Sequence, residues 1–196
     1  MYRIKEVFKS IQGEGSMAGT AMIFVRFAGC PVGCTFCDTD YVGTDGQHGF
    51  EGSVTDLLDR VGLFAVDCRY QKEWVLLTGG EPAVQVDDAL IKSIHDAGLR
   101  VAIETSGLFP IAPDIDHVCV SPKGDNICVT TGDDLKVLVP DFNPLDYDAS
   151  GFRHKFVQPV WGAGVTDRNT KHAVDFVERH TEWRLSVQTH KFIGLQ

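Results

Sequence analysis

Three closely spaced cysteines, Cys30, Cys34 and Cys37, constrain the fold of this chain more than any other feature. Their CxxxCxxC spacing brings three thiolates around one small volume, which suits a soft metal or an iron-sulfur cluster better than disulfides, whose geometry favours pairs. A structural zinc site usually has four protein ligands, and an ordinary electron-transfer cluster has four cysteines. Three thiolates on a 4Fe-4S cluster leave one iron open for a cofactor or a substrate.

The spacing alone leaves a zinc site as an alternative, with a distant fourth ligand such as Cys68 or His48. In that alternative the protein is a non-enzymatic zinc-binding module. Otherwise we expect Cys68, Cys119 and Cys128 to be buried or incidental thiols. The chain length and the clustered spacing favour a reducing compartment over a set of disulfides.

The length of 196 residues predicts one domain that spans residues 1–196. A complete eightfold β/α barrel needs about 250 residues, so a reduced barrel is expected. The formal net charge of −9 argues against non-specific binding to nucleic acid and favours a small-molecule substrate. Charges interrupt the amino-terminal segment and no run of about 18 apolar residues occurs, so we expect no secretory signal, no membrane span and a cytoplasmic protein.

Hydrophobic periodicity predicts strands that outnumber helices. Strands are expected at residues 2–11, 21–27, 74–78, 100–104, 117–120, 135–139, 155–158 and 184–188. Helices are expected from the Ser53 cap through Val61, at residues 87–97 before Gly98, and at residues 166–180. This order predicts an α/β fold, a reduced, partial β/α barrel with about six core strands and about three helices. Polar motifs should then gather at the carboxyl ends of parallel strands.

Phe36 lies between the last two cysteines, and the pattern CxxxCxΦC, with Φ aromatic, resembles the signature of the radical S-adenosylmethionine (SAM) enzymes. The resemblance implies a barrel of the radical SAM type, in which the open iron of the cluster chelates the amino and carboxylate groups of SAM. Electron transfer then cleaves SAM to a 5'-deoxyadenosyl radical. The sequence Gly-Gly-Glu-Pro at residues 79–82 is similar to a motif of these enzymes in which bare glycine backbone meets the SAM amino group.

Motifs spread over nearly the whole chain resemble the 7-carboxy-7-deazaguanine synthase family. They are SIQGEG at residues 10–15, FAGC at 27–30, CDT at 37–39, TGGEP at 78–82, ETSG at 104–107, SPK at 121–123 and QTHK at 188–191. The resemblance implies conversion of 6-carboxy-5,6,7,8-tetrahydropterin to 7-carboxy-7-deazaguanine with loss of ammonia, on the pathway to queuosine and related deazapurines. It also implies a homodimer that depends on Mg²⁺ and on an external electron donor such as flavodoxin.

The same resemblance implies roles for individual residues. Cys30, Cys34 and Cys37 would hold the 4Fe-4S cluster, and Thr39 would give its hydroxyl to Mg²⁺, with Asp38 orienting the bound waters. Residues expected to bind SAM are Phe36, Cys37, Asp38, Gly80, Glu104, Ser121, Pro122, Lys123, Gln158, Pro159, Val160 and Trp161. Residues expected to bind the pterin are Ile11, Gln12, Gly13, Glu14, Arg26, Thr78, His190 and, through the carboxyl terminus, Gln196.

Four of these roles have a specific chemical reason. Glu104 can accept hydrogen bonds from the SAM ribose, and Lys123 can meet the SAM carboxylate. Glu14 can accept from the guanidine-like edge of the pterin, unless it is an ordinary loop carboxylate. Arg26 can clamp the substrate carboxylate with its bidentate fork. The alternative for Arg26 is a structural pair with a nearby acid, because an arginine within so apolar a strand needs a partner.

Another radical SAM enzyme, such as an activase that installs a glycyl radical on a partner protein, is a further alternative. It would share the three cysteines and residues 79–82, but it has no evident need for Gln12, Glu14, Arg26 and the terminal Gln-Thr-His together. Colour separates both enzymes from the zinc module, because an anaerobically reconstituted iron-sulfur protein is brown and a zinc protein is colourless.

Overall fold

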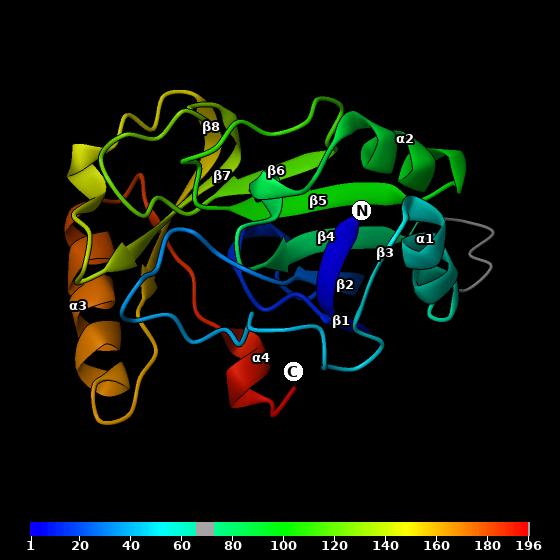
Figure 1. The fold of residues 1–196 in the computed structure, drawn as a ribbon. Helices are drawn as coiled ribbons and strands as arrows, with labels where there is room; N and C mark the ends of the chain where they lie inside the picture. Colours follow the sequence, from blue (N-terminus) through cyan, green and yellow to red (C-terminus); the bar gives the residue numbers. More distant parts are fainter. Residues whose placement is uncertain (66–72, 196) are drawn as a thin grey trace.

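The computed structural model of the protein describes residues 1–65 and 73–195. Its strands form one nine-stranded sheet in the order β3-β1-β2-β4-β5-β6-β7-β8-β9 (Figure 1). The strands are β1 (Tyr2–Ile11), β2 (Ala21–Phe27), β3 (Phe50–Gly52), β4 (Trp74–Gly79), β5 (Arg100–Thr105), β6 (His117–Val120), β7 (Gly132–Val139), β8 (Phe152–Pro159) and β9 (Arg184–Leu185). The helices are α1 (Val54–Gly62), α2 (Asp88–Asp96), α3 (Thr166–Arg179) and α4 (Thr189–Phe192), with 3-10 turns η1 (Gly15–Met17), η2 (Pro82–Val84) and η3 (Pro144–Asp146).

Most of the sheet is parallel. Every pair of neighbours from β2 to β9 is parallel, and only β1 is antiparallel to the strands beside it. The outermost strands, β3 and β9, are not paired with each other, so the barrel is open. No α-helix connects β5 to β6, β6 to β7 or β7 to β8 within the described residues. The predicted α/β partial barrel with about six core strands is confirmed.

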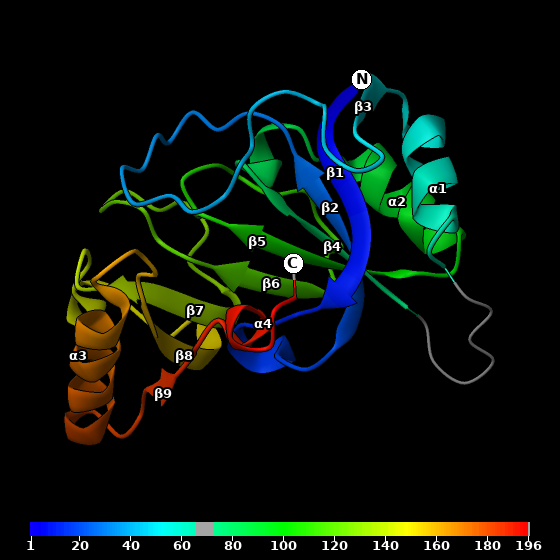
Figure 2. The ribbon, with the colours of Figure 1, turned by 90° about the horizontal axis from the view of Figure 1, so that it is seen from below.

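The end of the chain differs from the strand predicted at residues 184–188. β9 covers only Arg184–Leu185, and Gln188 is the N-cap of the short helix α4. The chain turns there because the Thr189 backbone N–H donates to Gly13 O at 3.0 Å, which brings α4 beside the turn after β1 (Figure 2). The prediction is wrong at this point because local apolar alternation carries no information about so distant a partner.

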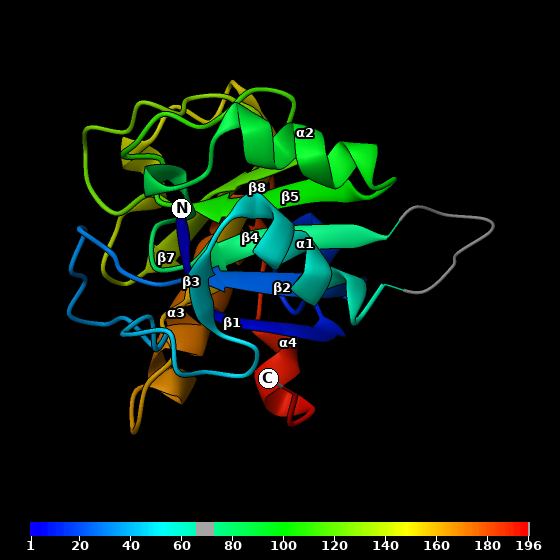
Figure 3. The same cartoon turned by 45° about the vertical axis from the view of Figure 1, so that its right-hand side comes forward.

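Local sequence signals begin the first two helices at the predicted positions. Ser53 and Asp56 form a reciprocal capping box at α1, and the Asp87 carboxylate accepts from Leu90 N at 2.9 Å at α2. The two helices lie side by side on one face of the sheet (Figure 3), and their apolar side chains share one core with β1, β2, β4 and β5. None of the described helices is long and apolar enough to cross a membrane.

Side chains of the later strands alternate between an outer apolar core and the inside of the barrel. On β7, Leu135, Val137 and Val139 join the core under α3, whereas Lys136 and Leu138 line the internal cavity. One strand therefore contributes to packing and to a polar interior at the same time.

An apolar cluster closes the barrel interior below this polar region. Its buried members are Phe8, Met22, Phe24, Trp74, Leu76 and Ala102. The rings of Phe8 and Phe24 stack with centroids 5.0 Å apart. The cavity therefore opens toward the carboxyl ends of the parallel strands, whereas a separate buried polar pair, His117 and Asp134, lies near the amino ends of β6 and β7.

Replacing Leu57 by alanine is expected to lower the free energy of unfolding by about 2–5 kcal/mol, because a fully buried side chain on α1 leaves a cavity. The matched control is Leu63→Ala at the end of the same helix. Leu63 is 65% exposed, and its loss should change the free energy by less than about 0.5 kcal/mol. Urea unfolding followed by circular dichroism measures both values, and equal losses would contradict the described packing of α1.

Candidate active site

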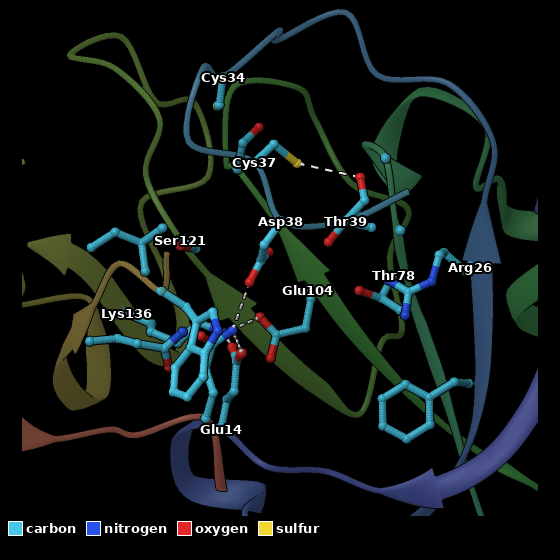
Figure 4. A pocket seen from close by; sticks show the side chains of 18 of the residues that line it. Glu14, Arg26, Cys34, Cys37, Asp38, Thr39, Thr78, Glu104, Ser121 and Lys136 are labelled. Carbon is cyan, nitrogen blue, oxygen red and sulfur yellow. Dashed lines mark hydrogen bonds and ion pairs between the residues drawn. The ribbon is translucent and has the colours of Figure 1, made fainter. Parts of the chain in front are cut away.

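A cavity of about 450 Å³ opens at the carboxyl ends of the parallel strands (Figure 4). Its walls come from the ends of β2 and β4 to β8, the turn after β1, and two further segments. These are the cysteine loop (residues 28–49, between β2 and β3) and the carboxyl-terminal segment (residues 188–195). Phe8, Phe24 and Leu76 form an apolar floor. The cavity thus has an apolar base and a polar rim, as ligand sites commonly do.

The cysteine loop places three thiols on the cavity. Cys30, Cys34 and Cys37 are free and all three line it. The Cys37 Sγ lies 3.8 Å from Thr39 O, and Figure 4 shows Cys34 and Cys37 on the same loop above the carboxylates. Burial raises the pKa of the Cys34 thiol, and the nearby Lys123 ammonium opposes that shift. The loop presents a set of soft donors to one space.

This donor set suits an iron-sulfur cluster, because thiolates are the ligands that such clusters take. Among the described residues, no three His, Cys, Asp or Glu side chains are close enough to hold a metal ion as they stand. A 4Fe-4S cluster does not need three ligands around one ion, because each cysteine thiolate binds a different iron of the cluster. Of the two candidate fourth zinc ligands, His48 has its ring against Phe64, 5.4 Å between centroids, and Cys68 lies outside the described residues.

Two glycines hold the cysteine loop against the end of β4. Gly80 donates its N–H to Phe27 O at 3.0 Å, and a Cβ atom added at Gly80 would lie 1.9 Å from Gly29 O. Gly79 has a φ of +113°, a conformation that other residues rarely adopt. The glycine motif is therefore required by the packing of the protein itself, in addition to any contact with a ligand.

Glu81, the acid of the same motif, joins the ends of β4 and β5. Glu81 is 1% exposed. Its carboxylate accepts from Thr105 Oγ1 at 2.7 Å and from Ser106 N at 2.8 Å, and it also accepts from the Ser106 hydroxyl. These bonds satisfy a buried charge and fix the two strand ends that carry the rim of the cavity.

A buried lysine joins two carboxylates inside the cavity, as Figure 4 shows. Lys136 Nζ donates to Glu104 Oε2 at 2.8 Å and also to the Glu14 carboxylate. Gln12 Nε2 donates to Glu104 Oε1 at 3.1 Å, and Gln12 Oε1 accepts from the Glu14 backbone N–H at 3.2 Å. Burial alone would raise the pKa of Glu14, but the Lys136 charge and hydrogen bonds from Lys136 and two glutamines lower it to about 2. Glu14 is therefore ionised at neutral pH.

Lys123 is a second lysine of the cavity. Its Nζ donates to Ser121 Oγ at 2.6 Å and to Ser121 O at 3.0 Å. Burial, with a further contribution from the positive charge of Lys136, lowers the pKa of Lys123 to about 8. An anionic ligand group beside Lys123 would offset the cost of burying its positive charge and would favour the charged form of the lysine.

Arg26 faces the cavity from β2, beside its register partner Thr78 on β4 (Figure 4). Its Nε donates to Glu6 Oε1 at 2.7 Å, which is the kind of structural pair that the sequence leaves open as an alternative. A guanidinium has five N–H donors, so this pair and a ligand carboxylate need not use the same donor. The pair orients the arginine at the cavity wall.

The carboxyl-terminal segment docks on the turn after β1. Thr189 Oγ1 donates to Gly13 O at 3.1 Å, beside the backbone bond between the same two residues. A Cβ atom on Gly13 would lie 2.1 Å from His190 Nδ1, so the glycine makes room for the histidine ring. Burial lowers the pKa of His190. Gly13 thereby positions a residue that lines the cavity.

The same segment also contacts the cysteine loop. Gln188 Nε2 donates to Glu14 Oε1 at 2.8 Å and to Asp38 Oδ2 at 3.3 Å. Lys191 Nζ forms an ion pair with the Asp38 carboxylate and lies 5.1 Å from the centroid of the Trp161 ring. Gln188 and Lys191 thus connect the cysteine loop to the turn after β1.

Most residues predicted for the site meet in this one cavity. Those that line it are Ile11, Gln12, Glu14, Arg26, Cys30, Cys34, Phe36, Cys37, Asp38, Thr39, Thr78, Gly80, Glu104, Ser121, Lys123, Gln158, Pro159, Val160, Trp161 and His190. Gly13 and Pro122 are buried and do not line it, and Gln196 lies outside the described residues. His190 belongs to α4 rather than to the end of a strand.

Sequence reasoning misses Lys136 and Lys191 as site residues. For Lys136 a signal exists, because a lysine between Leu135 and Val137 in an apolar strand needs a partner, as Arg26 does on β2. For Lys191 no local signal exists, since its partner Asp38 is 153 positions away in the chain.

Residues 24–119, which include the cysteine loop and the glycine motif, match the Radical SAM superfamily. A partial barrel with three loop cysteines at the carboxyl ends of its strands is the arrangement of this class. The superfamily implies a 4Fe-4S cluster and SAM as cofactors, and the match favours the cluster over the zinc alternative.

Curated relatives define the family more narrowly. The 7-carboxy-7-deazaguanine synthases of Burkholderia multivorans and Bordetella pertussis are 42% and 43% identical to this chain, each over 99% of both sequences. The crystal structure of QueE from Escherichia coli is similar with a TM-score of 0.71 and 27% identity, over 95% of this chain and 93% of that chain. The chain belongs to the 7-carboxy-7-deazaguanine synthase family, as its motifs predict.

Gly80→Ala is expected to lower the iron and acid-labile sulfide bound per chain several-fold after anaerobic reconstitution. The added methyl overlaps Gly29 O and pushes the cysteine loop away from β4. Gly62→Ala is the control, since a Cβ atom there has no neighbour within 4 Å, and it should leave the iron content unchanged. A Gly80→Ala protein that binds the same amount of iron would show that the close approach does not position the loop.

Proposed function

We propose that this protein is a ring-contracting carbon-nitrogen lyase that converts 6-carboxy-5,6,7,8-tetrahydropterin to 7-carboxy-7-deazaguanine with loss of ammonia, in 7-deazapurine (queuosine) biosynthesis. The observation that supports it most is one cavity that holds three thiols, a cation at one wall and an ionised carboxylate at another. A carboxylated pterin carries an anionic group and an edge rich in N–H donors. Arg26 suits the first and Glu14 suits the second.

The cysteine loop and the strand ends beside it would form the cofactor half of the site. When bound, the 4Fe-4S cluster and SAM supply the radical that starts the reaction at C6 of the pterin. Cys30, Cys34 and Cys37 would hold the cluster, as the donor chemistry of the loop allows. Lys123 would meet the SAM carboxylate and Glu104 the ribose. The apolar floor and the carboxyl-terminal segment would keep solvent away from the reacting atoms.

The opposite half would hold the pterin. Glu6 occupies the Nε edge of Arg26, so the remaining N–H donors of the guanidinium can take the substrate carboxylate as a fork. Glu14 would accept hydrogen bonds from the pterin edge, while Gln188 Nε2 donates to Oε1 of the same carboxylate. Thr78 and His190 line the space between these groups. This arrangement orients the ring by two charges at separate positions, which is what a specific hydrogen abstraction needs.

Further parts of the proposal rest on the family resemblance. Thr39 would bind Mg²⁺ with waters oriented by Asp38, and both residues line the cavity. Gln196 would reach the pterin through a terminal carboxylate. We also propose one radical SAM domain over residues 1–196, a homodimer, and an external reductant such as flavodoxin. A reducing cytoplasmic location agrees with the free thiols of the described cysteines.

The reaction is tested by incubating anaerobically reconstituted, reduced protein with SAM, Mg²⁺ and 6-carboxytetrahydropterin and detecting 7-carboxy-7-deazaguanine by mass spectrometry. Wild-type protein should form the product and Cys34→Ala should not, because it lacks one of the three proposed cluster ligands. Cys128→Ala removes an exposed thiol outside the cysteine loop and should keep full activity. SAM cleavage without a deazapurine would sink the substrate assignment and leave the radical chemistry standing.

Arg26→Gln is expected to raise KM for the pterin about 10- to 100-fold, the loss expected when a charge-assisted hydrogen-bond pair worth about 1.5–3 kcal/mol is removed. The affinity for SAM, measured by calorimetry in the same variant, should stay within about threefold of wild type because Arg26 is not assigned to SAM. An unchanged KM together with a lower melting temperature would mean that Arg26 serves only its pair with Glu6.

A further inference from the structure

Lys136 is a buried cation that has no role in the ligand assignments above. Its side chain is 4% exposed, and it lies on the inner side of β7 because Leu135 and Val137 take the outer core. Burial alone would lower the pKa of Lys136, but Cys119 and the two neighbouring carboxylates hold it well above its usual range. The side chain is therefore a permanent positive charge inside the barrel.

The contacts of Lys136 close a ring of hydrogen bonds. From Lys136 the ring runs to Glu104, from Glu104 to the Gln12 side chain, from Gln12 to the Glu14 backbone, and from the Glu14 carboxylate back to Lys136. It joins three parts of the fold: the turn after β1, the end of β5 and the middle of β7. Moving either carboxylate breaks a bond to the same ammonium.

The two carboxylates in this ring belong to different ligand sites. Under the proposed function Glu14 accepts from the pterin edge, and Glu104 accepts from the SAM ribose. Two acids that are close enough to share one ammonium repel each other, and a buried pair without a cation binds a proton between them. A protonated carboxyl group donates where the ligand requires an acceptor.

We propose that Lys136 is a positioning residue for both ligands: its ammonium keeps the carboxylates of Glu14 and Glu104 unprotonated together and holds both in the cavity. Lys136 itself need not touch either ligand. The identity of the two ligands rests on the proposed function, whereas the contacts of the lysine do not.

Other titratable groups also lie near these carboxylates. They are Cys119 and, farther away, His117 on the side of Glu104, His190 on the side of Glu14, Lys123 near both, and Asp38 through Gln188. The Cys119 thiol is uncharged at neutral pH, because burial raises its pKa well above the usual range. All of them remain in place when only Lys136 is changed. Lys123 also responds to Lys136, because loss of the Lys136 charge would raise the pKa of Lys123 and favour its charged form. That change favours binding of an anionic ligand group, so weaker binding at neutral pH in a variant at position 136 reports on Glu14 and Glu104.

The test measures the binding of SAM alone, and of 6-carboxytetrahydropterin with SAM present, to the reconstituted, unreduced holoenzyme by calorimetry from about pH 6 to about pH 9. Lys136→Met is expected to raise both dissociation constants at neutral pH by at least about tenfold, as the loss of a charged hydrogen-bond partner does. Its pterin affinity should recover as pH rises, because the shared proton is then lost. Lys136→Arg keeps a cation and should show the wild-type pH profile.

Lys155→Met on the neighbouring strand β8 is the matched control, and it should leave both dissociation constants unchanged because Lys155 does not line the cavity. The proposal is overturned if Lys136→Met weakens only one ligand, or if the Met and Arg variants share one pH profile. Wild-type protein that binds SAM but no pterin would refute the proposed function instead, and the SAM measurements on Lys136→Met would still decide the role of the lysine.

If Lys136→Met does not fold, as circular dichroism would show, a charge-balanced comparison replaces it. Glu14→Gln is compared with the double variant Glu14→Gln, Lys136→Met. Both proteins keep Glu104 as the remaining acid of the pair, so they differ only at position 136. The proposal predicts a SAM dissociation constant several-fold higher in the double variant, because Glu104 has lost the group that holds it. Equal SAM affinities would show that Lys136 does not position Glu104.

Discussion

The Lys136 ammonium lies between the carboxylates of Glu14 and Glu104 and bridges positions 122 and 32 residues away in the chain. Taking three charges out of water is costly, and the attraction among them offsets that cost only when the remaining hydrogen-bonding groups also find partners. Gln12 and Gln188 supply those partners here. The interaction therefore adds little to stability by itself, and its main effect is to fix how the turn after β1 approaches the sheet.

A second constraint acts on the opposite wall of the cavity, where backbone meets backbone. Gly80 lies so close to Gly29 that no side chain fits between β4 and the start of the cysteine loop. Glu81 then fixes the end of β5 from the next position. A short motif thus sets the height of the cysteine loop above the strands, while the ring around Lys136 sets the position of the acids below it.

Much of this arrangement can be predicted from local patterns. Strands such as β2 and β6, the Ser53 cap of α1, and the gathering of motifs at strand ends all follow from periodicity and from the rule for parallel sheets. The contacts of residues 188–195 do not, because Lys191 reaches Asp38 and Thr189 reaches Gly13 across almost the whole chain. Lys136 is an intermediate case. Its burial is readable from the apolar residues on each side, but its partners are not.

The alternation along β7 also has a consequence for folding. A parallel strand has many possible pairings with its neighbours, and a slip of one residue turns every side chain to the other face. In β7 such a slip would put Asp134 and Lys136 into the apolar layer beneath α3 and would turn Leu135, Val137 and Val139 into the barrel. Wrong pairings are penalised strongly at this strand, because buried charges would lose their partners. The charged side chains on the inner face of β7 thereby favour one register of this strand in the sheet.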